Sequence, residues 1–155
     1  WNQGGMNDLS KLYTVFTVDA VSLPALKDTA LGVIATQTWS PDLDNPMNQK
    51  FVADYKAKYG GYPSFYAAQA YDTMMAIDYA IGKAGSADTE AMRAVLAGGG
   101  IPTTRGILQM NSNQFPIQNV YLREVVLDSD GVATTKIIDT VFENHGDAYA
   151  KDCKF

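Results

Sequence analysis

Apolar residues recur at helical spacing along residues 59–85, which is the clearest periodic pattern in the chain. The periodic positions are Ala67, Ala70, Met74, Ile77 and Ile81, with Tyr71 and Met75 widening the stripe. Ser64 can cap the first turn through its hydroxyl, and Gly85 can close the last turn in the left-handed conformation. The pattern therefore predicts one long, largely buried helix.

The first turn of this predicted helix carries a hydroxyl and two aromatic rings, from Ser64, Phe65 and Tyr66. The first N–H groups of a helix have no partner within the helix, so they attract acceptor or anionic groups. Neighbouring rings add apolar contact area for a ligand. Two interpretations stay open: the turn holds a ligand, or Phe65 and Tyr66 simply pack in the core.

Two further helices are predicted on either side of this one. The earlier helix begins with Asn45 as N-cap and Pro46 at the first helical position, and it ends at Gly60. Its apolar face consists of Met47, Phe51, Val52, Tyr55 and Tyr59. The later helix begins at Asp88 or Thr89, and a run of three glycines stops it.

Five stretches have the β-branched and aromatic content of strands. They are residues 12–18, 32–38, 106–110, 120–127 and 134–142. The first two are joined by an irregular or helical link, residues 19–29, which Pro24 interrupts. The order of strands, then helices, then strands predicts an α/β protein rather than a helix bundle or a β-sandwich.

Composition narrows the possible partners. A chain of 155 residues with 46% hydrophobic and 19% charged residues suits one globular domain. The net charge of −5, with scattered lysines and arginines, argues against a nucleic-acid or anionic-membrane partner, because both need a basic cluster. No apolar run approaches the roughly 20 residues of a membrane-spanning helix, so we expect no direct membrane span. The chain opens at Trp1 without an initiating Met, which is typical of a fragment.

Residues that could perform catalysis are sparse. The one histidine, His145, has no second histidine or cysteine cluster with which to form a zinc site, so we expect it to be solvated or locally hydrogen-bonded. The one cysteine, Cys153, suggests a partner thiol elsewhere if the protein is exported and would be unremarkable in a cytosolic protein. Asp72 and Asp78 point to different helix faces and cannot share a proton, and Arg105 is expected in a surface salt bridge. The sequence predicts no catalytic residue, no metal and no cofactor.

Three motifs carry a resemblance to a known family. They are a Phe-x-x-x-Tyr-x-x-x-Tyr-Gly helix, a Pro followed by an Ala-Tyr-Asp helix, and an Arg-Gly strand followed by a hairpin. Their residues are Phe51, Tyr55, Tyr59, Gly60, Pro63, Ala70, Tyr71, Asp72, Arg105 and Gly106. Over essentially its whole length, the chain resembles the C-terminal portion of a type I periplasmic solute-binding protein of an ABC transporter, in the branch typified by the Leu/Ile/Val-binding proteins. Its closing segments resemble members that take up aromatic acids as well as amino acids.

The resemblance implies a fold of two Rossmann-like α/β lobes that are joined by three crossings and close over a ligand by hinge rotation. Residues 1–38 would then end the second lobe. Residues 39–115 would form a hinge crossing with the helices and strand of the first lobe, and residues 116–155 the return crossing and C-terminal hairpin. Pieces of two lobes leave faces uncovered, and self-association of the fragment is one way to bury them.

The resemblance also implies which residues contact the ligand. The expected ligand-binding residues are Trp1, Asn2, Gln3, Trp39, Ser64, Phe65 and Tyr66. In the family, the turn before the Ala-Tyr-Asp helix supplies an aromatic contact, which falls here on Phe65 or Tyr66. Trp39 either faces the cleft or plugs the hinge.

Amino-acid-binding members place a carboxylate in the second-lobe loop, where it pairs with the ligand ammonium. The corresponding loop here has Asn2 and Gln3, with no acid before Asp8. An ammonium buried without a counter-charge costs about 3–5 kcal/mol, which reduces affinity more than a hundredfold. This disfavours an α-amino acid unless Asp8 substitutes, and it favours an aromatic or other apolar carboxylate.

The function implied is that of a periplasmic receptor that captures a small carboxylate, either an aromatic acid or a branched-chain amino acid. The receptor would deliver this ligand to the membrane permease of its ABC transporter. An alternative is a ligand-sensing domain of a receptor or regulator with the same fold, which a flanking transmembrane or DNA-binding segment in the gene would reveal. An α/β enzyme is a third possibility, weakened by the lack of a nucleophile–base pair in the sequence.

Overall fold

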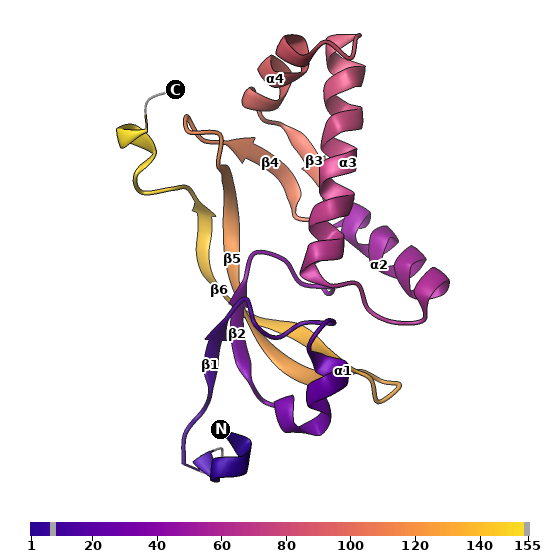
Figure 1. The fold of residues 1–155 in the computed structure, drawn as a ribbon, viewed down its shortest axis with the longest axis vertical. Coiled ribbons are helices and arrows are strands. Elements are labelled where there is room, and N and C mark those ends of the chain that lie inside the picture. The colour runs from indigo at the N-terminus through magenta and orange to yellow at the C-terminus, as the bar shows by residue number, and fades with distance from the viewer. Residues whose placement is uncertain (7–8, 154–155) are drawn as a thin grey trace.

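The computed structural model describes residues 1–6 and 9–153, and a long antiparallel strand pair runs through its middle (Figure 1). The pair consists of β5 (Pro116–Leu127) and β6 (Ala133–His145). Helices α3 (Phe65–Ala84) and α4 (Thr89–Ala97) lie toward one end of the long axis. The short helix α1 (Leu23–Leu26) lies toward the other end.

Strand β5 also hydrogen-bonds to two other strands. Its residues 121–124 pair antiparallel with β2 (Ile34–Gln37), and its first two residues pair antiparallel with β4 (Gly106–Met110). Strand β1 (Tyr13–Val15) runs parallel to β2, and β3 (Ile101–Thr103) runs antiparallel to β4. The strand order is β1-β2-β5-β4-β3, with β6 on β5. This mixed sheet with helices confirms the predicted α/β class.

The predicted helix caps are present in the structure. Asn45, Ser64 and Asp88 cap α2 (Pro46–Tyr59), α3 and α4, and each side chain accepts a hydrogen bond of 2.9–3.2 Å from a backbone N–H of the first turn. Gly85 ends α3 with a φ of 68°, a conformation that glycine adopts at little cost. The shorter 3-10 helices are η1 (Asn2–Gly4), η3 (Lys27–Ala30) and η4 (Ala150–Asp152).

Helix α3 buries a different face from the one that its periodicity predicts. Its buried residues are Phe65, Ala68, Asp72 and Ala80. Met74, from the predicted stripe, is 65% exposed, and Ile81 is exposed as well. The helix packs against β3 and α4 with its other side. The helix itself is confirmed, but its predicted buried stripe is wrong, because alanines on adjoining faces make either face acceptable in the sequence pattern.

Several smaller predictions differ from the structure. Pro24 lies in the first turn of α1 rather than interrupting a link, because proline lacks only an N–H that is unpaired in a first turn anyway. Tyr59 ends α2 on its exposed side rather than on the predicted apolar face. Strand β5 begins at Pro116 rather than at residue 120, and β6 extends to His145. The three-residue strand β3 is too short to leave a pattern in the sequence.

Two apolar clusters form the core. One lies among the segment after β1, α1, η3, β2 and β5 and consists of Val18, Leu23, Ala30, Ala35 and Val125. The other lies where the segment after β2 meets α2 and α3 and consists of Trp39, Phe51, Phe65 and Ala68. The second cluster holds the first turn of α3 in place, because Phe65 belongs to both.

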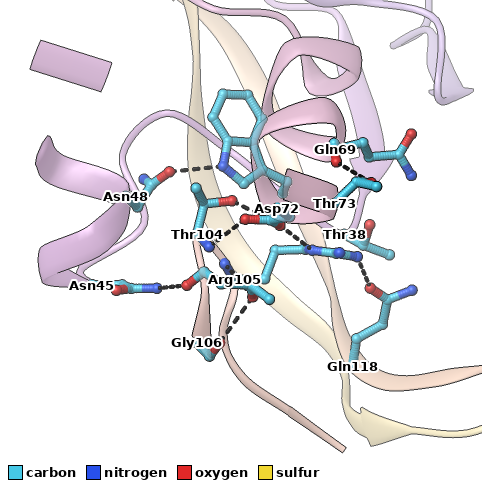
Figure 2. A network of polar contacts seen from close by, with 12 residues as sticks. Thr38, Asn45, Asn48, Gln69, Asp72, Thr73, Thr104, Arg105, Gly106 and Gln118 are labelled. Carbon is cyan, nitrogen blue, oxygen red and sulfur yellow. Dashed lines mark hydrogen bonds and ion pairs between the residues drawn. The ribbon is translucent and has the colours of Figure 1, made fainter. Parts of the chain in front are cut away.

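A buried polar network anchors α3 to the strands (Figure 2). Asp72 accepts hydrogen bonds from the Thr104 N–H at 2.6 Å, the Thr104 hydroxyl at 3.1 Å and Arg105 Nε at 3.1 Å. Arg105 Nη1 then donates to Gln118 Oε1 on β5 at 2.6 Å. The Arg105 side chain is only 12% exposed, so the predicted surface salt bridge is in fact a largely buried one. Asp72 thus connects α3 to the β3–β4 turn and, through Arg105, to β5.

The substitution Asp72→Asn tests this anchor. An amide nitrogen in place of one carboxylate oxygen faces donors and leaves Arg105 without its counter-charge, so we expect a loss of roughly 3 kcal/mol in the free energy of unfolding. Urea unfolding followed by circular dichroism measures the difference. Asp78→Asn is the matched control, because Asp78 is an exposed aspartate on the same helix. Equal unfolding free energies for the two variants would contradict the assignment.

The turn between β5 and β6 is tied to the segment between α2 and α3. The Tyr62 hydroxyl donates to Asp128 Oδ2 at 2.9 Å, and Lys56 Nζ lies 3.9 Å from the same oxygen. The backbone N–H groups of Asp130 and Val132 donate to Asp128 Oδ1 at 3.0 and 2.8 Å. The hydrogen bond from Val132, together with those from Tyr62 and Asp130, lowers the pKa of Asp128 below its ordinary value.

A lowered pKa in the folded state makes the contribution of Asp128 dependent on pH. The stabilisation is complete above the ordinary pKa of 3.8 and is lost as the pH falls through the lower folded-state value. We therefore expect Asp128→Asn to lower the thermal unfolding midpoint at pH 7, and the gap to wild type to shrink toward pH 2. Differential scanning calorimetry across this range measures it, with Asp78→Asn as the control. A gap that stays constant with pH would show that the charge of Asp128 is not responsible.

Candidate functional site

The first turn of α3 meets the loop that follows β1. The Ser64 hydroxyl oxygen accepts from the Ala67 N–H at 3.2 Å, and Asp19 Oδ2 accepts from the Phe65 N–H at 3.1 Å. The expectation that Phe65 offers a free N–H is therefore wrong, because the carboxylate of Asp19 occupies it. Within the described residues, the Tyr66 N–H is the first-turn donor left for another acceptor.

Three aromatic rings gather at this turn. The ring of Phe65 lies edge-on to Phe16 and to Tyr66, with centroid distances of 5.8 Å in both cases. Phe65 is buried, as the core-packing interpretation expects, whereas Phe16 and Tyr66 are 51% and 64% exposed. The turn therefore presents two open rings beside a buried one, which is a surface suited to an apolar or aromatic body.

The loop after β1 has a defined conformation of its own. Asp19 Oδ1 accepts from the Val21 N–H at 2.9 Å, and the Ser22 hydroxyl donates to the Thr17 carbonyl at 3.1 Å. Phe16 has a φ of 56°, which costs a non-glycine residue on the order of 1–3 kcal/mol and recurs at functional sites. We refer to residues 16–19 as the β1–α1 loop.

Sequence reasoning did not identify Phe16 and Asp19 as site residues. A signal for them exists, because Asp19 follows the carboxyl end of β1, which is parallel to β2. Ligands in open α/β sheets bind outside the carboxyl ends of strands. No local motif marks Asp19, so the sequence pattern predicts only that it begins the link between two strands.

The predicted second-lobe contacts lie elsewhere. Trp1 is exposed and lines a cavity of about 400 Å³ with Gln3, Leu12 and Thr14, between β1 and the α1–η3 segment. No residue of α3 lines this cavity. Asn2 lies in η1, and Asp8 lies outside the described residues. The ligand contacts of Trp1, Asn2 and Gln3 remain predictions.

Trp39 is enclosed by the second apolar cluster. Only 1% of it is exposed, and its indole Nε1 donates to Asn48 Oδ1 at 2.7 Å. Its ring packs edge-on to Phe51 with a centroid distance of 6.4 Å. This is the environment that the hinge-plug alternative requires, with the polar end of the indole satisfied by a side chain.

The position of Asp19 changes the electrostatic argument about the ligand. The sequence argument against an α-amino acid rests on the loop at Asn2 and Gln3, which has no acid before Asp8. Asp19 stands beside the aromatic contacts and can accept hydrogen bonds from an ammonium or a hydroxyl group. The arrangement therefore suits a ligand with an apolar body and a hydrogen-bond donor directed at Asp19.

The remaining candidate residues do not join this site. His145 is exposed and stacks on Phe142 with a centroid distance of 4.9 Å, and Cys153 carries an exposed free thiol. In the part of the chain that the structure describes, no three His, Cys, Asp or Glu residues are grouped as a metal site requires. None of the described helices is long and apolar enough to span a bilayer.

Solved structures with the same fold are solute-binding proteins. One is a solute-binding protein of an ABC transporter from Rhodopseudomonas palustris BisB5 in complex with 3,4-dihydroxybenzoic acid, at a TM-score of 0.82 and 28% identity, covering 95% of this chain and 41% of that one. A second, from R. palustris in complex with benzoate, has a TM-score of 0.81 and 26% identity over 99% of this chain and 42% of that one. A leucine-binding protein from Thermotoga maritima has a TM-score of 0.70 and 25% identity over 89% of this chain and 39% of that one.

Sequence comparison gives the same result. The Leu/Ile/Val-binding protein homolog 6 of Brucella abortus is 38% identical over 130 residues, which cover 81% of this chain and 33% of the relative. The chain thus spans about a third of the length of the curated relatives that it matches. The family model described as periplasmic binding protein matches residues 2–131. With a match over this much of its length, the chain belongs to the periplasmic binding protein family.

Proposed function

We propose that the protein is the solute-binding receptor of an ABC transporter, which captures a small carboxylate and delivers it to the membrane permease from the periplasm. The ligand is an aromatic acid or a branched-chain amino acid. The observation that carries the proposal is the meeting of Phe16, Phe65 and Tyr66 with the carboxylate of Asp19 at one helix turn. Rings accommodate the body of such a ligand, and a carboxylate fixes its donor group.

The charge of Asp19 sets the orientation of the ligand. A ligand carboxylate placed beside Asp19 would meet like charge, so it points away from the β1–α1 loop. A phenolic hydroxyl or an ammonium, in contrast, donates to Asp19. Hydroxylated benzoates and branched-chain amino acids both have an apolar body with a donor in addition to the carboxylate.

The relatives support this class of ligand. The R. palustris proteins are described with 3,4-dihydroxybenzoic acid and benzoate, and others with 4-hydroxybenzoate, whereas the T. maritima protein is a leucine-binding protein. The Brucella relatives are named as Leu/Ile/Val-binding protein homologues. These names describe two chemically distinct classes of ligand, and the members of both have one carboxylate and one compact apolar body.

The proposal assigns residues 1–38 to the second lobe, residues 39–115 to a hinge crossing with first-lobe elements, and residues 116–155 to the return crossing and hairpin. The two separate apolar clusters support this division, because each lobe needs its own core. The contact between Phe16 and Phe65 then joins the lobes across the ligand cleft. Ligand binding would stabilise this closed arrangement.

Calorimetric titration of the gene-encoded protein in full tests the proposed function. The ligands are 4-hydroxybenzoate, benzoate, leucine and valine, with glutamate as a negative control. We expect binding of 4-hydroxybenzoate or of leucine. For the ligand that binds, Asp19→Asn is expected to reduce affinity about tenfold, because a charge-assisted hydrogen bond becomes a neutral one. Affinity for benzoate, which has no donor, should not fall. If none of the four candidate ligands binds, the proposal is wrong.

Tyr66→Ala tests the role of the open ring. Removal of a ring that contacts the ligand is expected to reduce affinity about tenfold, with little change in the unfolding midpoint, because Tyr66 is largely solvent-exposed. Tyr59→Ala is the matched control, since Tyr59 is a tyrosine of similar exposure (62%) at the end of α2. Isothermal titration of both variants with the same ligand measures the difference. If both variants bind like wild type, Tyr66 is not a contact residue.

A further inference from the structure

Arg123 is a buried cation at the place where the segments around the site converge. Only 1% of the residue is exposed, and it lies on β5 in the stretch that pairs with both β2 and β6. A cavity of about 10 Å³ beside it is also lined by Asp19, Trp39 and Pro63. Arg123 therefore borders the β1–α1 loop, the segment after β2 and the residue that precedes the N-cap of α3.

The guanidinium of Arg123 is aimed by two hydrogen bonds. Nη2 donates to the Val18 carbonyl of the β1–α1 loop, and Nη1 donates to the Thr135 hydroxyl on β6, both at 3.2 Å. Among residues 1–6 and 9–153, Nε has no acceptor, and the adjoining cavity has room for about one water molecule. Burial lowers the pKa of Arg123 to about 10, whereas the carboxylates of Asp19 and Asp42 oppose this shift. The side chain is therefore charged at neutral pH.

The β1–α1 loop needs an anchor at this point. Phe16 is held in the left-handed region, with a φ of 56°, and such a conformation persists only where the surroundings enforce it. On one side, the Phe16 N–H donates to the Thr36 carbonyl at 3.2 Å. On the other side, two residues further along, Arg123 holds the Val18 carbonyl. Asp19, which binds the Phe65 N–H, follows directly.

We infer that Arg123 is a positioning residue of the ligand site, whose guanidinium holds the Val18 carbonyl and thereby fixes Phe16 and Asp19 against the first turn of α3. An arginine suits this role because its planar fork donates in several fixed directions at once. The consequence for ligand affinity rests on the proposed function. The consequence for the bond between Asp19 and the Phe65 N–H does not, because both groups belong to this chain and no ligand atom takes part in the bond.

Hydrogen exchange of the ligand-free protein, resolved by amide with NMR, tests the inference directly. We expect Arg123→Met to reduce the protection of the Phe65 amide about tenfold or more, because Asp19 loses its fixed position. The Ala67 amide, which Ser64 of the same turn caps, is the internal control and should change little. Thr135→Val is the matched variant, because it removes the other bond of the guanidinium and leaves the Val18 bond intact.

Arg123→Lys is a second variant that keeps the inference testable if Arg123→Met does not fold. A lysine keeps the charge but has fewer fixed donors, so we expect protection of the Phe65 amide between that of wild type and that of the Met variant. Unchanged protection at Phe65 in both variants would overturn the inference. An equal loss of protection at the Phe65 and Ala67 amides, seen in Thr135→Val as well as in Arg123→Met, would also overturn the inference. That pattern would show that Arg123 stabilises the fold in general rather than the position of Asp19.

Ligand titration of the same variants separates this inference from the proposed function. If the protein binds 4-hydroxybenzoate or leucine, Arg123→Met should weaken binding about tenfold. Adding Asp19→Asn to that variant should weaken it little further, because both changes act through one contact. Strictly additive effects would contradict action through Asp19. If no ligand binds, the proposed function fails, whereas the exchange result still decides the role of Arg123.

Discussion

The backbone hydrogen bonds of β5 hold the two apolar clusters in one structure. Residues 121–124 of this strand pair with β2, beside the cluster that contains Val125, while Pro116 and Ile117 pair with β4 on the α3 side. Because both sets of hydrogen bonds are made by one strand, a rotation of β5 that breaks its bonds to β2 also disturbs its bonds to β4. The placement of α3 relative to α1 therefore depends on the pairing of one strand.

Two buried charged side chains, Asp72 and Arg123, fix further segments around β5. On α3, the Asp72 carboxylate holds the β3–β4 turn, and on β5 the Arg123 guanidinium holds the β1–α1 loop. Each charge is costly to bury, yet its hydrogen bonds are directional, which apolar packing is not. The site is thus built from two segments that are oriented by polar contacts and packed by apolar ones, with Val18 in one apolar cluster and Phe65 in the other.

Much of the fold was predictable from local patterns, and the reasons for the failures are physical. The caps Asn45, Ser64 and Asp88 were identified because a cap uses only neighbouring backbone groups. The buried face of α3 was not predicted, because it depends on the contacts of α3 with β3 and α4, which are distant from the pattern in the sequence. Likewise, the sequence predicts Arg105 at the surface, because its contact with Asp72 forms only in the folded chain.

The sequence pattern pointed to two of the four residues that meet at the candidate site. Phe65 and Tyr66 were found because a cap, two rings and a helix start are adjacent in the sequence. Phe16 and Asp19 were missed because they approach Phe65 only in the folded chain, across a sequence separation of 46 residues for the hydrogen bond. The family resemblance implied the fold and pointed to the loop at Trp1, whereas the three aromatic rings meet at the β1–α1 loop and the first turn of α3.

The irregular register of β5 against β6 has a consequence for how such chains vary in length. The pairing shifts between Gln118 and Val120, again before Tyr121, and again between Leu122 and Arg123. In a regular strand, one inserted or deleted residue turns all later side chains to the opposite face. A bulge absorbs such a change locally by bending the strand. At each shift the extra residue lies on β6. Evolution can therefore lengthen or shorten this part of β6 while Arg123 and Val125 of β5 keep their inward direction.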